Sequence, residues 1–125
     1  MQVRAERIAE ILRKAEHEGV IEDADGYGRA EHPLCGDAVE FYIKVEEGVI
    51  SRARFRALAC AAAIATSELA AQLAEGMEVE QAEKLSVEQI EREAGSLPEI
   101  NRCCKEVGVR ALRSAVADYR GKQNT

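Results

Sequence analysis

The sequence predicts an α+β fold in which a small antiparallel sheet of two to three strands packs against several helices. Side chains alternate between apolar and polar from residue 37 to residue 58, interrupted by one short turn. An alanine-rich segment with high helix propensity follows at 60–75, and a helical apolar stripe occupies the C-terminal quarter. A chain of 125 residues is long enough for one modest core, so we expect a single domain over residues 1–125.

The N-terminal segment predicts a helix over residues 3–16. Its apolar stripe comprises Val3, Ile8, Ile11, Leu12 and Ala15. Gly19 is expected to end this helix. Residues 20–34 are punctuated by Gly, Asp and Pro, which indicates an irregular segment with room for a short strand around residues 27–30.

Period-two alternation predicts a β-hairpin in the next segment. In the first strand, over residues 37–45, Val39, Phe41 and Ile43 alternate with more polar side chains. Residues 46–48 form the turn, and residues 49–58 form the second strand. Ile50 falls on the same side as the arginines of this strand and departs from the alternation.

The remainder of the chain predicts helices. The first covers residues 60–75 and ends at Gly76, and a short one covers residues 79–85. Ser86 and Gln89 have the form of a capping box that starts a helix ending near Gly95. A second capping box at residues 96–99 starts the last helix, which is expected to reach about Tyr119 before a polar tail at 121–125.

Composition narrows the function classes. A net charge of -6 without a Lys/Arg-rich block argues against nucleic acid or an anionic membrane surface as the main partner. The longest apolar run, residues 57–65, is too short to span a bilayer, and the charged N-terminus has no signal-peptide core. We therefore expect a soluble, cytoplasmic protein, in which four cysteines are free thiols or metal ligands rather than disulfides.

The cysteines lie at element boundaries or near element ends. Cys35 precedes a strand, Cys60 separates a strand from a helix, and Cys103 and Cys104 lie early in the last helix. Such positions can direct several thiols to one edge of the fold, and a helix N-terminus favours the thiolate that binds metal. Spacing alone does not separate this interpretation from four buried structural thiols. Likewise, Asp37 could simply cap or fix a turn before the strand.

Charged neighbours of these cysteines have two interpretations. Arg102 and Lys105 flank the cysteine pair and could favour thiolate or meet an acidic partner, or they could be solvated helix charges. His32 is expected at the surface, and the acidic stretch from Glu78 to Glu93 is expected to be a solvated helical face.

A specific combination of motifs surrounds the cysteines. Pro33-x-Cys35-Gly36-Asp37 precedes a strand, and Phe55 comes before a helix that opens with the sequence from Cys60 to Ser67. Leu97-Pro98 then precedes Cys104. From residue 21 to residue 119 this order resembles the IscU/NifU family of iron–sulfur cluster assembly scaffolds, which implies a SufE/NifU-like fold.

The resemblance implies a scaffold rather than an enzyme. A transient [2Fe–2S] cluster would be built from iron and from persulfide sulfur supplied by a cysteine desulfurase, and then passed to apo iron–sulfur acceptor proteins. Cys35, Cys60 and Cys104 match the family cysteines, with Cys104 as persulfide acceptor, and Asp37 matches the aspartate that gates cluster release. Zinc at the same ligands on isolation, frataxin-like or ferredoxin partners, and a homodimer sharing one cluster are compatible with the family.

The sequence departs from the family at three places. Cys103 replaces the usual His before the last cysteine, so the fourth ligand is open between Asp37 and Cys103. A thiolate would hold a cluster tightly, whereas a carboxylate would leave it labile, so release favours Asp37 with Cys103 as an exchangeable thiol. Residues 97–101 differ from the family's chaperone-binding loop, which weakens the expectation of a dedicated Hsp70 chaperone, and the usual Asn-Pro-Arg-Asn stretch is missing.

Two alternatives belong to other classes. One is a zinc-bound sulfur acceptor for a cysteine desulfurase, as in SufU proteins, but the interval from Cys60 to Cys104 has no room for the insertion those proteins carry. The other is an interaction domain stabilised by zinc or a disulfide.

Overall fold

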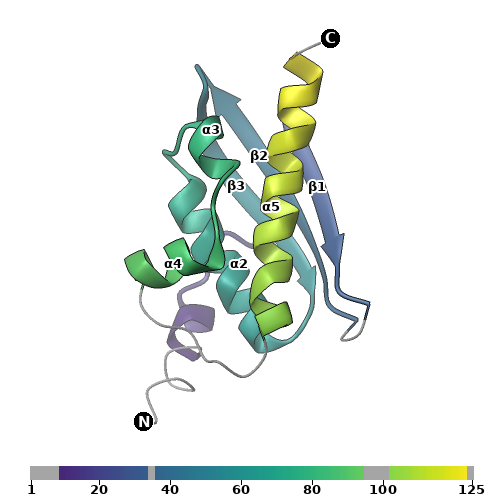
Figure 1. The fold of residues 1–125 in the computed structure, drawn as a ribbon, viewed down its shortest axis with the longest axis vertical. Helices are drawn as coiled ribbons and strands as arrows, with labels where there is room; N and C mark the ends of the chain where they lie inside the picture. The colour runs from purple at the N-terminus through teal and green to yellow at the C-terminus, as the bar shows by residue number, and fades with distance from the viewer. Residues whose placement is uncertain (1–8, 34–35, 95–101, 124–125) are drawn as a thin grey trace.

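The fold is that of a computed structural model, which describes residues 9–33, 36–94 and 102–123, apart from the side chains of residues 94, 102–104 and 123. Three strands form an antiparallel sheet in the order β1 (Gly26–Glu31), β2 (Ala38–Glu46) and β3 (Val49–Leu58). The helices α2 (Ala61–Ala74), α3 (Val79–Ala82), α4 (Val87–Ala94) and α5 (Arg102–Gln123) follow in sequence, and Figure 1 shows α2 and α5 packed on one face of the sheet. The predicted α+β class is confirmed, and the sheet has three of the two to three strands expected.

The β2–β3 hairpin contains a bulge that the alternation did not predict. Lys44 pairs with Arg52 but Val45 pairs with Ile50, so Ser51 has no opposite residue on β2. The Ser51 hydroxyl donates to the Lys44 carbonyl, 3.2 Å away. The extra residue reverses the side-chain parity, which is why Ile50 is buried on the core face rather than lying beside the arginines.

The turn of this hairpin is a tight one. Glu47 and Gly48 both have positive φ, at 54° and 78°. Two successive residues with positive φ match the twist of the flanking strands, and glycine at the second position relieves half of the steric cost. The turn predicted at residues 46–48 is therefore confirmed.

The core lies between the sheet and the helices. Val39, Phe41, Ile43 and Phe55 are fully buried on the inner face of the strands. The alanines of α2 that face them are also fully buried, and they allow this helix to lie close to the sheet: Ala63, Ala70, Ala71 and Ala74. From α5, Val107, Ala111, Leu112 and Ala115 complete the predicted apolar stripe.

Helix α5 approaches β1 more closely than any side chain would allow. At Gly28 the space for a Cβ is filled by the backbone of Ala111 and Ala115, and at Gly26 it is filled by Ala115 and Tyr119. These contacts fix the direction of the helix, because residues later in β1 meet residues earlier in α5. The start of α5 therefore lies toward the C-terminal end of β1, as Figure 1 also shows.

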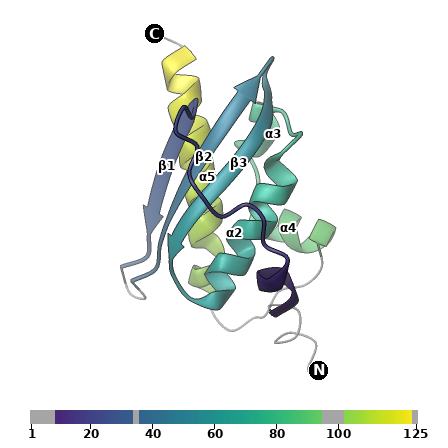
Figure 2. The ribbon, with the colours of Figure 1, turned by 180° about the vertical axis from the view of Figure 1, so that it is seen from behind.

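The N-terminal helix ends earlier than predicted. Of the predicted range, residues 3–8 lie outside the described residues, and residues 9–13 are helical. The helix does not continue to residue 16, because the chain becomes extended and pairs with the free edge of β3 through a parallel bridge between Glu18 and Phe55. Residues 14–25, which we call the strap, then run across the outer side of the sheet to β1 (Figure 2).

The strap is tied down over its length. Ile21 is 3 % exposed, the ammonium of Lys44 donates to the Asp23 carbonyl at 2.7 Å, and the Val45 amide donates to the Asp25 carboxylate at 2.8 Å. The predicted irregular segment is thus an ordered connection, and the short strand expected near residues 27–30 is β1.

Helix α5 runs past the predicted end at Tyr119. Gly121 and Lys122 remain helical, so the expected polar tail from residue 121 is wrong for the described residues. Lys122 pairs with Asp118 one turn earlier, and Arg120 pairs with Glu83 after α3. These ion pairs offset the modest cost of an exposed helical glycine, which is about 1 kcal/mol relative to alanine.

The sequence predicted the residue that caps α4 but not the capping box that starts α3. Ser86 accepts a hydrogen bond from the Gln89 amide at 3.1 Å, which confirms it as the cap of α4. A capping box between Glu78 and Gln81 starts α3 and was missed, because Glu is an uncommon capping residue. The capping box predicted at residues 96–99 lies outside the described residues. No helix in the described part of the chain is both long and apolar enough to cross a membrane.

The close contact of α5 with β1 generates a stability prediction. Gly28→Ala should lower the free energy of unfolding by about 3 kcal/mol, the upper end for overpacking, because the new methyl group overlaps the α5 backbone. Urea denaturation measures this change. The matched control is Gly121→Ala, whose methyl group meets open space and should raise stability by about 0.5–1 kcal/mol. Equal effects of the two substitutions would contradict the described seating of α5.

Candidate metal centre

Two of the predicted site residues, Asp37 and Cys60, are in contact. The Asp37 side chain is buried, with 6 % of the residue exposed, whereas Cys60 is exposed. One carboxylate oxygen of Asp37 accepts from the Cys60 backbone amide at 3.3 Å, and the other accepts from the Cys60 thiol at 3.4 Å. A carboxylate and a reachable thiol thus share one position at the surface.

The hairpin pairing produces this contact. Ala38 at the start of β2 pairs with Leu58 at the end of β3, so Asp37 lies opposite the junction between β3 and α2. Cys60 is the N-cap residue of α2 but its own side chain caps no backbone amide. The Asp37 carboxylate stands at this helix start instead, where the helix dipole favours negative charge. Asp37 therefore has a structural role at the start of α2, which agrees with the simpler expectation of a capping residue.

Cys35 belongs to the loop between β1 and β2 and lies outside the described residues. The ends of that loop are described: the His32 amide donates to the Asp37 carbonyl at 2.9 Å, and the Gly36 amide donates to the His32 carbonyl at 2.8 Å. Gly36 has a φ of 75°, which suits glycine. The loop is therefore short and closes directly beside Asp37.

Cys103 and Cys104 lie in the first turn of α5, as predicted, but their side chains are outside the description. Figure 1 shows that α5 starts at the same end of the sheet as the β1–β2 loop and the start of α2. The meeting of all four cysteines remains a prediction. Within the described ranges, no group of three or more His, Cys, Asp or Glu side chains is arranged to hold a metal ion.

Burial of Lys105 excludes one of the two interpretations that the sequence left open. Lys105 is not a solvated helix charge: only 3 % of the residue is exposed, and its ammonium lies 3.2 Å from the Glu91 carboxylate of α4. The sequence carried a signal for this, because Lys105 shares its helical stripe with Val109 and Leu112. The ion pair attaches the first turn of α5 to α4.

The exposure of the other charged residues that the sequence analysis considered differs in detail from the expectation. His32 is half-buried rather than fully at the surface, and it takes part in the closed loop. The acidic stretch from Glu78 to Glu93 is largely the solvated face that was expected, because all its glutamates except Glu91 are exposed. Glu91 is half-buried where it pairs with Lys105. The Arg102 side chain lies outside the description.

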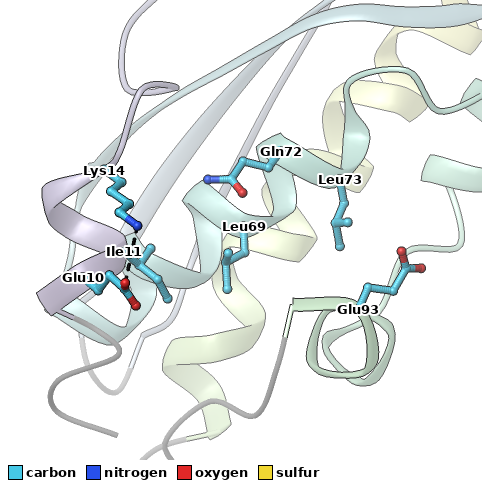
Figure 3. Close-up of a pocket in the computed structure, with 7 residues that line it drawn as sticks. All are labelled: Glu10, Ile11, Lys14, Leu69, Gln72, Leu73 and Glu93. Atoms are coloured by element: carbon cyan, nitrogen blue, oxygen red, sulfur yellow. Dashed lines mark hydrogen bonds and ion pairs between the residues drawn. The ribbon is translucent and has the colours of Figure 1, made fainter. Parts of the chain in front are cut away.

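Hollows in the described surface do not supply a competing site. One of about 430 Å³ lies between the helical residues 9–13, α2 and α4, and Figure 3 shows Ile11, Leu69 and Leu73 lining it beside charged side chains. It contains no cysteine. A second hollow of about 430 Å³ lies on the outer face of the sheet, where Ala38 and the exposed Leu58 border the Asp37–Cys60 pair.

Comparison with known proteins identifies the class. The sequence matches the family described as NifU-like N terminal domain over residues 4–125. The fold agrees: a NifU-like protein (N-terminal) from Brucella abortus has a TM-score of 0.73 at 21 % identity, covering 93 % of each chain.

Several relatives of similar sequence are named as iron–sulfur cluster assembly scaffold proteins. The chain is 36 % identical over 115 residues to "Iron-sulfur cluster assembly scaffold protein IscU 1" of Archaeoglobus fulgidus, covering 92 % of this chain and 75 % of the relative. It is also 36 % identical over 120 residues to the IscU scaffold protein of Aquifex aeolicus, covering 94 % and 76 %. The chain belongs to the IscU/NifU family, as the sequence motifs indicated.

The two hydrogen bonds of Asp37 predict a structural effect in the metal-free protein. Asp37→Ala should lower the free energy of unfolding by about 1–2 kcal/mol, because the amide and thiol of Cys60 lose their acceptor. Asp37→Asn keeps one oxygen acceptor and should recover part of the loss. Urea denaturation of protein treated with a chelator measures both. Glu22→Ala, an exposed change in the strap, is the control and should stay within about 0.5 kcal/mol; an equally small effect of Asp37→Ala would contradict the described contact.

Proposed function

We propose that this protein is a scaffold on which a transient [2Fe–2S] cluster is assembled and then passed to apo-proteins. The observation that carries the proposal is the contact between the exposed Cys60 thiol and the buried Asp37 carboxylate, in a chain whose relatives are named cluster assembly scaffolds. In this proposal the cluster is cargo, and the protein is a carrier without catalytic turnover of its own.

Chain connectivity supports the inclusion of Cys35. It is two residues from Asp37, and two peptide units span at most about 7 Å. The described ends of its loop close through His32, so the loop has little length in which to depart from the Asp37–Cys60 pair.

The register of α5 against β1 supports the inclusion of Cys104. Gly28 meets Ala111, and Cys104 lies seven residues before Ala111, or about 10.5 Å along a helix. From Gly28 to His32 the strand and its continuation cover about 13 Å in the same direction. The first turn of α5 therefore lies level with the loop that contains Cys35. The Lys105–Glu91 ion pair holds this turn in place.

The donor set suits iron and sulfur. Cysteine thiolates are the usual ligands of iron–sulfur clusters, and they need a reducing compartment such as the cytoplasm. A persulfide could be received by Cys104: its thiolate attacks the outer sulfur of the desulfurase persulfide, and the desulfurase cysteine leaves as a thiolate. Reduction of that sulfur to sulfide takes two electrons, which a ferredoxin partner would supply. A frataxin-like partner and a homodimer sharing one cluster are compatible with an exposed site.

Asp37 has a specific role in this proposal. In the cluster-free chain its carboxylate accepts from both the amide and the thiol of Cys60. A cluster that takes the Cys60 sulfur displaces the thiol hydrogen bond, and release restores it. Asp37 therefore stabilises the cluster-free state and favours release, whether or not its hard oxygen also ligates iron. Cys103 remains an exchangeable thiol next to the persulfide acceptor.

Anaerobic reconstitution tests the scaffold function. Ferrous iron, cysteine, a cysteine desulfurase and reduced ferredoxin, as the electron donor that converts persulfide sulfur to sulfide, should give a red-brown protein whose absorption and iron content correspond to a [2Fe–2S] cluster. Changing Cys35, Cys60 or Cys104 to Ser should each abolish this chromophore, whereas the matched control Cys103→Ser should keep it. A protein that forms no cluster but binds stoichiometric zinc and stimulates desulfurase turnover would replace the scaffold with the zinc-bound sulfur acceptor.

Transfer kinetics test the role of Asp37. Asp37→Ala should slow cluster transfer to an apo-ferredoxin by about fivefold, the equivalent of one lost hydrogen bond of about 1 kcal/mol in the cluster-free state. The measurement is the circular dichroism of the acceptor as it gains the cluster. Glu22→Ala provides the control rate. Indistinguishable transfer by Asp37→Ala and the control would remove Asp37 from the release step while leaving the scaffold function intact.

A further inference from the structure

A second cluster of ionisable side chains lies away from the cysteines, where the strap meets α2 and β3. His17 stands between two carboxylates: its Nδ1 lies 2.6 Å from Glu68, and its Nε2 lies 3.0 Å from Glu75. Arg54 of β3 lies 2.8 Å from the other oxygen of Glu75. Two cations and two anions therefore form one neutral group when the histidine is protonated.

The geometry favours a protonated ring. A neutral imidazole has one N–H donor and one acceptor nitrogen, whereas the imidazolium donates from both nitrogens. Both ring nitrogens of His17 face carboxylate oxygens, which only accept. With a neutral ring, one nitrogen lone pair would point at a carboxylate, and one of the two contacts would become repulsive.

Glu68 makes this protonation important for stability. It is fully buried in α2, and a buried carboxylate is costly unless donors surround it. Its donors are the His17 amide at 3.1 Å, the His17 ring and the Gln72 side chain at 2.9 Å. Two of the three come from His17, so a change at this residue leaves a buried charge short of partners.

His17 also connects this cluster to the sheet edge. The Phe55 amide donates to the His17 carbonyl at 2.9 Å, and the Gly19 amide donates to the Phe55 carbonyl at 2.7 Å. These two bonds are the parallel pairing between the strap and β3. The ring of His17 and the backbone around it thus hold the same part of the strap, one against α2 and the other against β3.

We propose that His17 is a protonation-controlled latch: the imidazolium fastens the N-terminal half of the strap to α2 and β3, and loss of its proton detaches that half from the edge of β3. The C-terminal half remains attached through Asp23 and Asp25 to β2. This inference concerns the strap alone and does not depend on the scaffold function.

The direction of the pH dependence follows from the surroundings of the ring. Burial alone would lower the pKa of His17, but the hydrogen bonds that its ring donates to Glu68 and Glu75 outweigh burial and raise its pKa above the usual 6.5. A raised pKa in the folded state means that the stabilisation is complete below about 6.5 and is lost as the pH rises through the raised value. The latch therefore opens on the alkaline side.

Glu75 sets an acid limit. Burial would raise the pKa of Glu75, but hydrogen bonds from the Ala53 amide, His17 and Arg54 outweigh it and lower the pKa below the usual 4.5. Its contribution is present above about 4.5 and is lost as the pH falls through the lowered value. The groups that face His17 are thus Glu68 and Glu75, from α2 and its end. Gln72 contacts Glu68, and Arg54 of β3 contacts Glu75.

Amide exchange across the His17 titration tests the latch. In the intact protein, NMR follows the His17 ring and the exchange of the Phe55 and Gly19 amides from about pH 6 to about pH 9, a range that brackets ordinary histidine values. The protection of these two amides should stay constant below the His17 pKa. It should then fall by up to about tenfold per pH unit, because opening is coupled to the loss of one proton.

The same strand offers an internal control. The Ile50 amide lies on the same edge of β3 but donates to the Met77 carbonyl at 2.9 Å, outside the strap, and its protection should not change with pH. His17→Gln should give low, pH-independent protection at Phe55 and Gly19, whereas His32→Gln, at the other histidine, should keep the wild-type fall. Constant protection of Phe55 and Gly19 through the titration of His17, or a fall that persists in His17→Gln, would overturn the proposal. The wild-type titration decides the question even if His17→Gln fails to fold.

Discussion

The direct seating of α5 on the backbone of β1 is the constraint on which the arrangement depends. Gly26 and Gly28 leave no side chain between strand and helix, so the two backbones meet and the axis of α5 is fixed along β1. This contact closes the core over the inner face of the sheet. It also determines where α5 begins, at the end of the sheet where the β1–β2 loop and the start of α2 lie. Segments distant in sequence are thus brought to one edge by two residues that have no side chain.

At that edge, the Asp37 carboxylate contacts both the backbone and the thiol of Cys60. A buried carboxylate at a helix start is a common structural device, and here it accepts from the backbone of the residue whose thiol is the candidate ligand. In the proposed function, the interaction that stabilises the chain without cargo would compete with cargo for Cys60. The proposal therefore links the stability of the empty scaffold and the ease of cluster release through the Asp37 side chain.

The sequence was sufficient to predict the helices and strands whose signals come from neighbouring residues. Alternation located both strands of the hairpin, and the alanines of 60–75 located α2. It failed where a partner distant in the sequence determines the structure. The N-terminal helix ends early because the chain around His17 binds β3 through its backbone and Glu68 through the His17 ring. Lys105 is buried in an ion pair with Glu91. The bulge at Ser51 was signalled only by the misplaced Ile50. At the site, the hairpin register accounts for Asp37 meeting Cys60, while the convergence of Cys35, Cys103 and Cys104 stays a prediction.

The strap has a further consequence for behaviour at high concentration. Without it, β3 would present its outer row of backbone groups around Phe55 to solvent, and an uncovered edge of this kind can template pairing between molecules. The parallel bridge of Glu18 with Phe55 occupies part of that row, and the Ile50–Met77 hydrogen bond occupies another. The segment before β1 thus covers part of an edge that could otherwise pair with another molecule, and it does so through backbone hydrogen bonds as well as through the side chains that attach the strap.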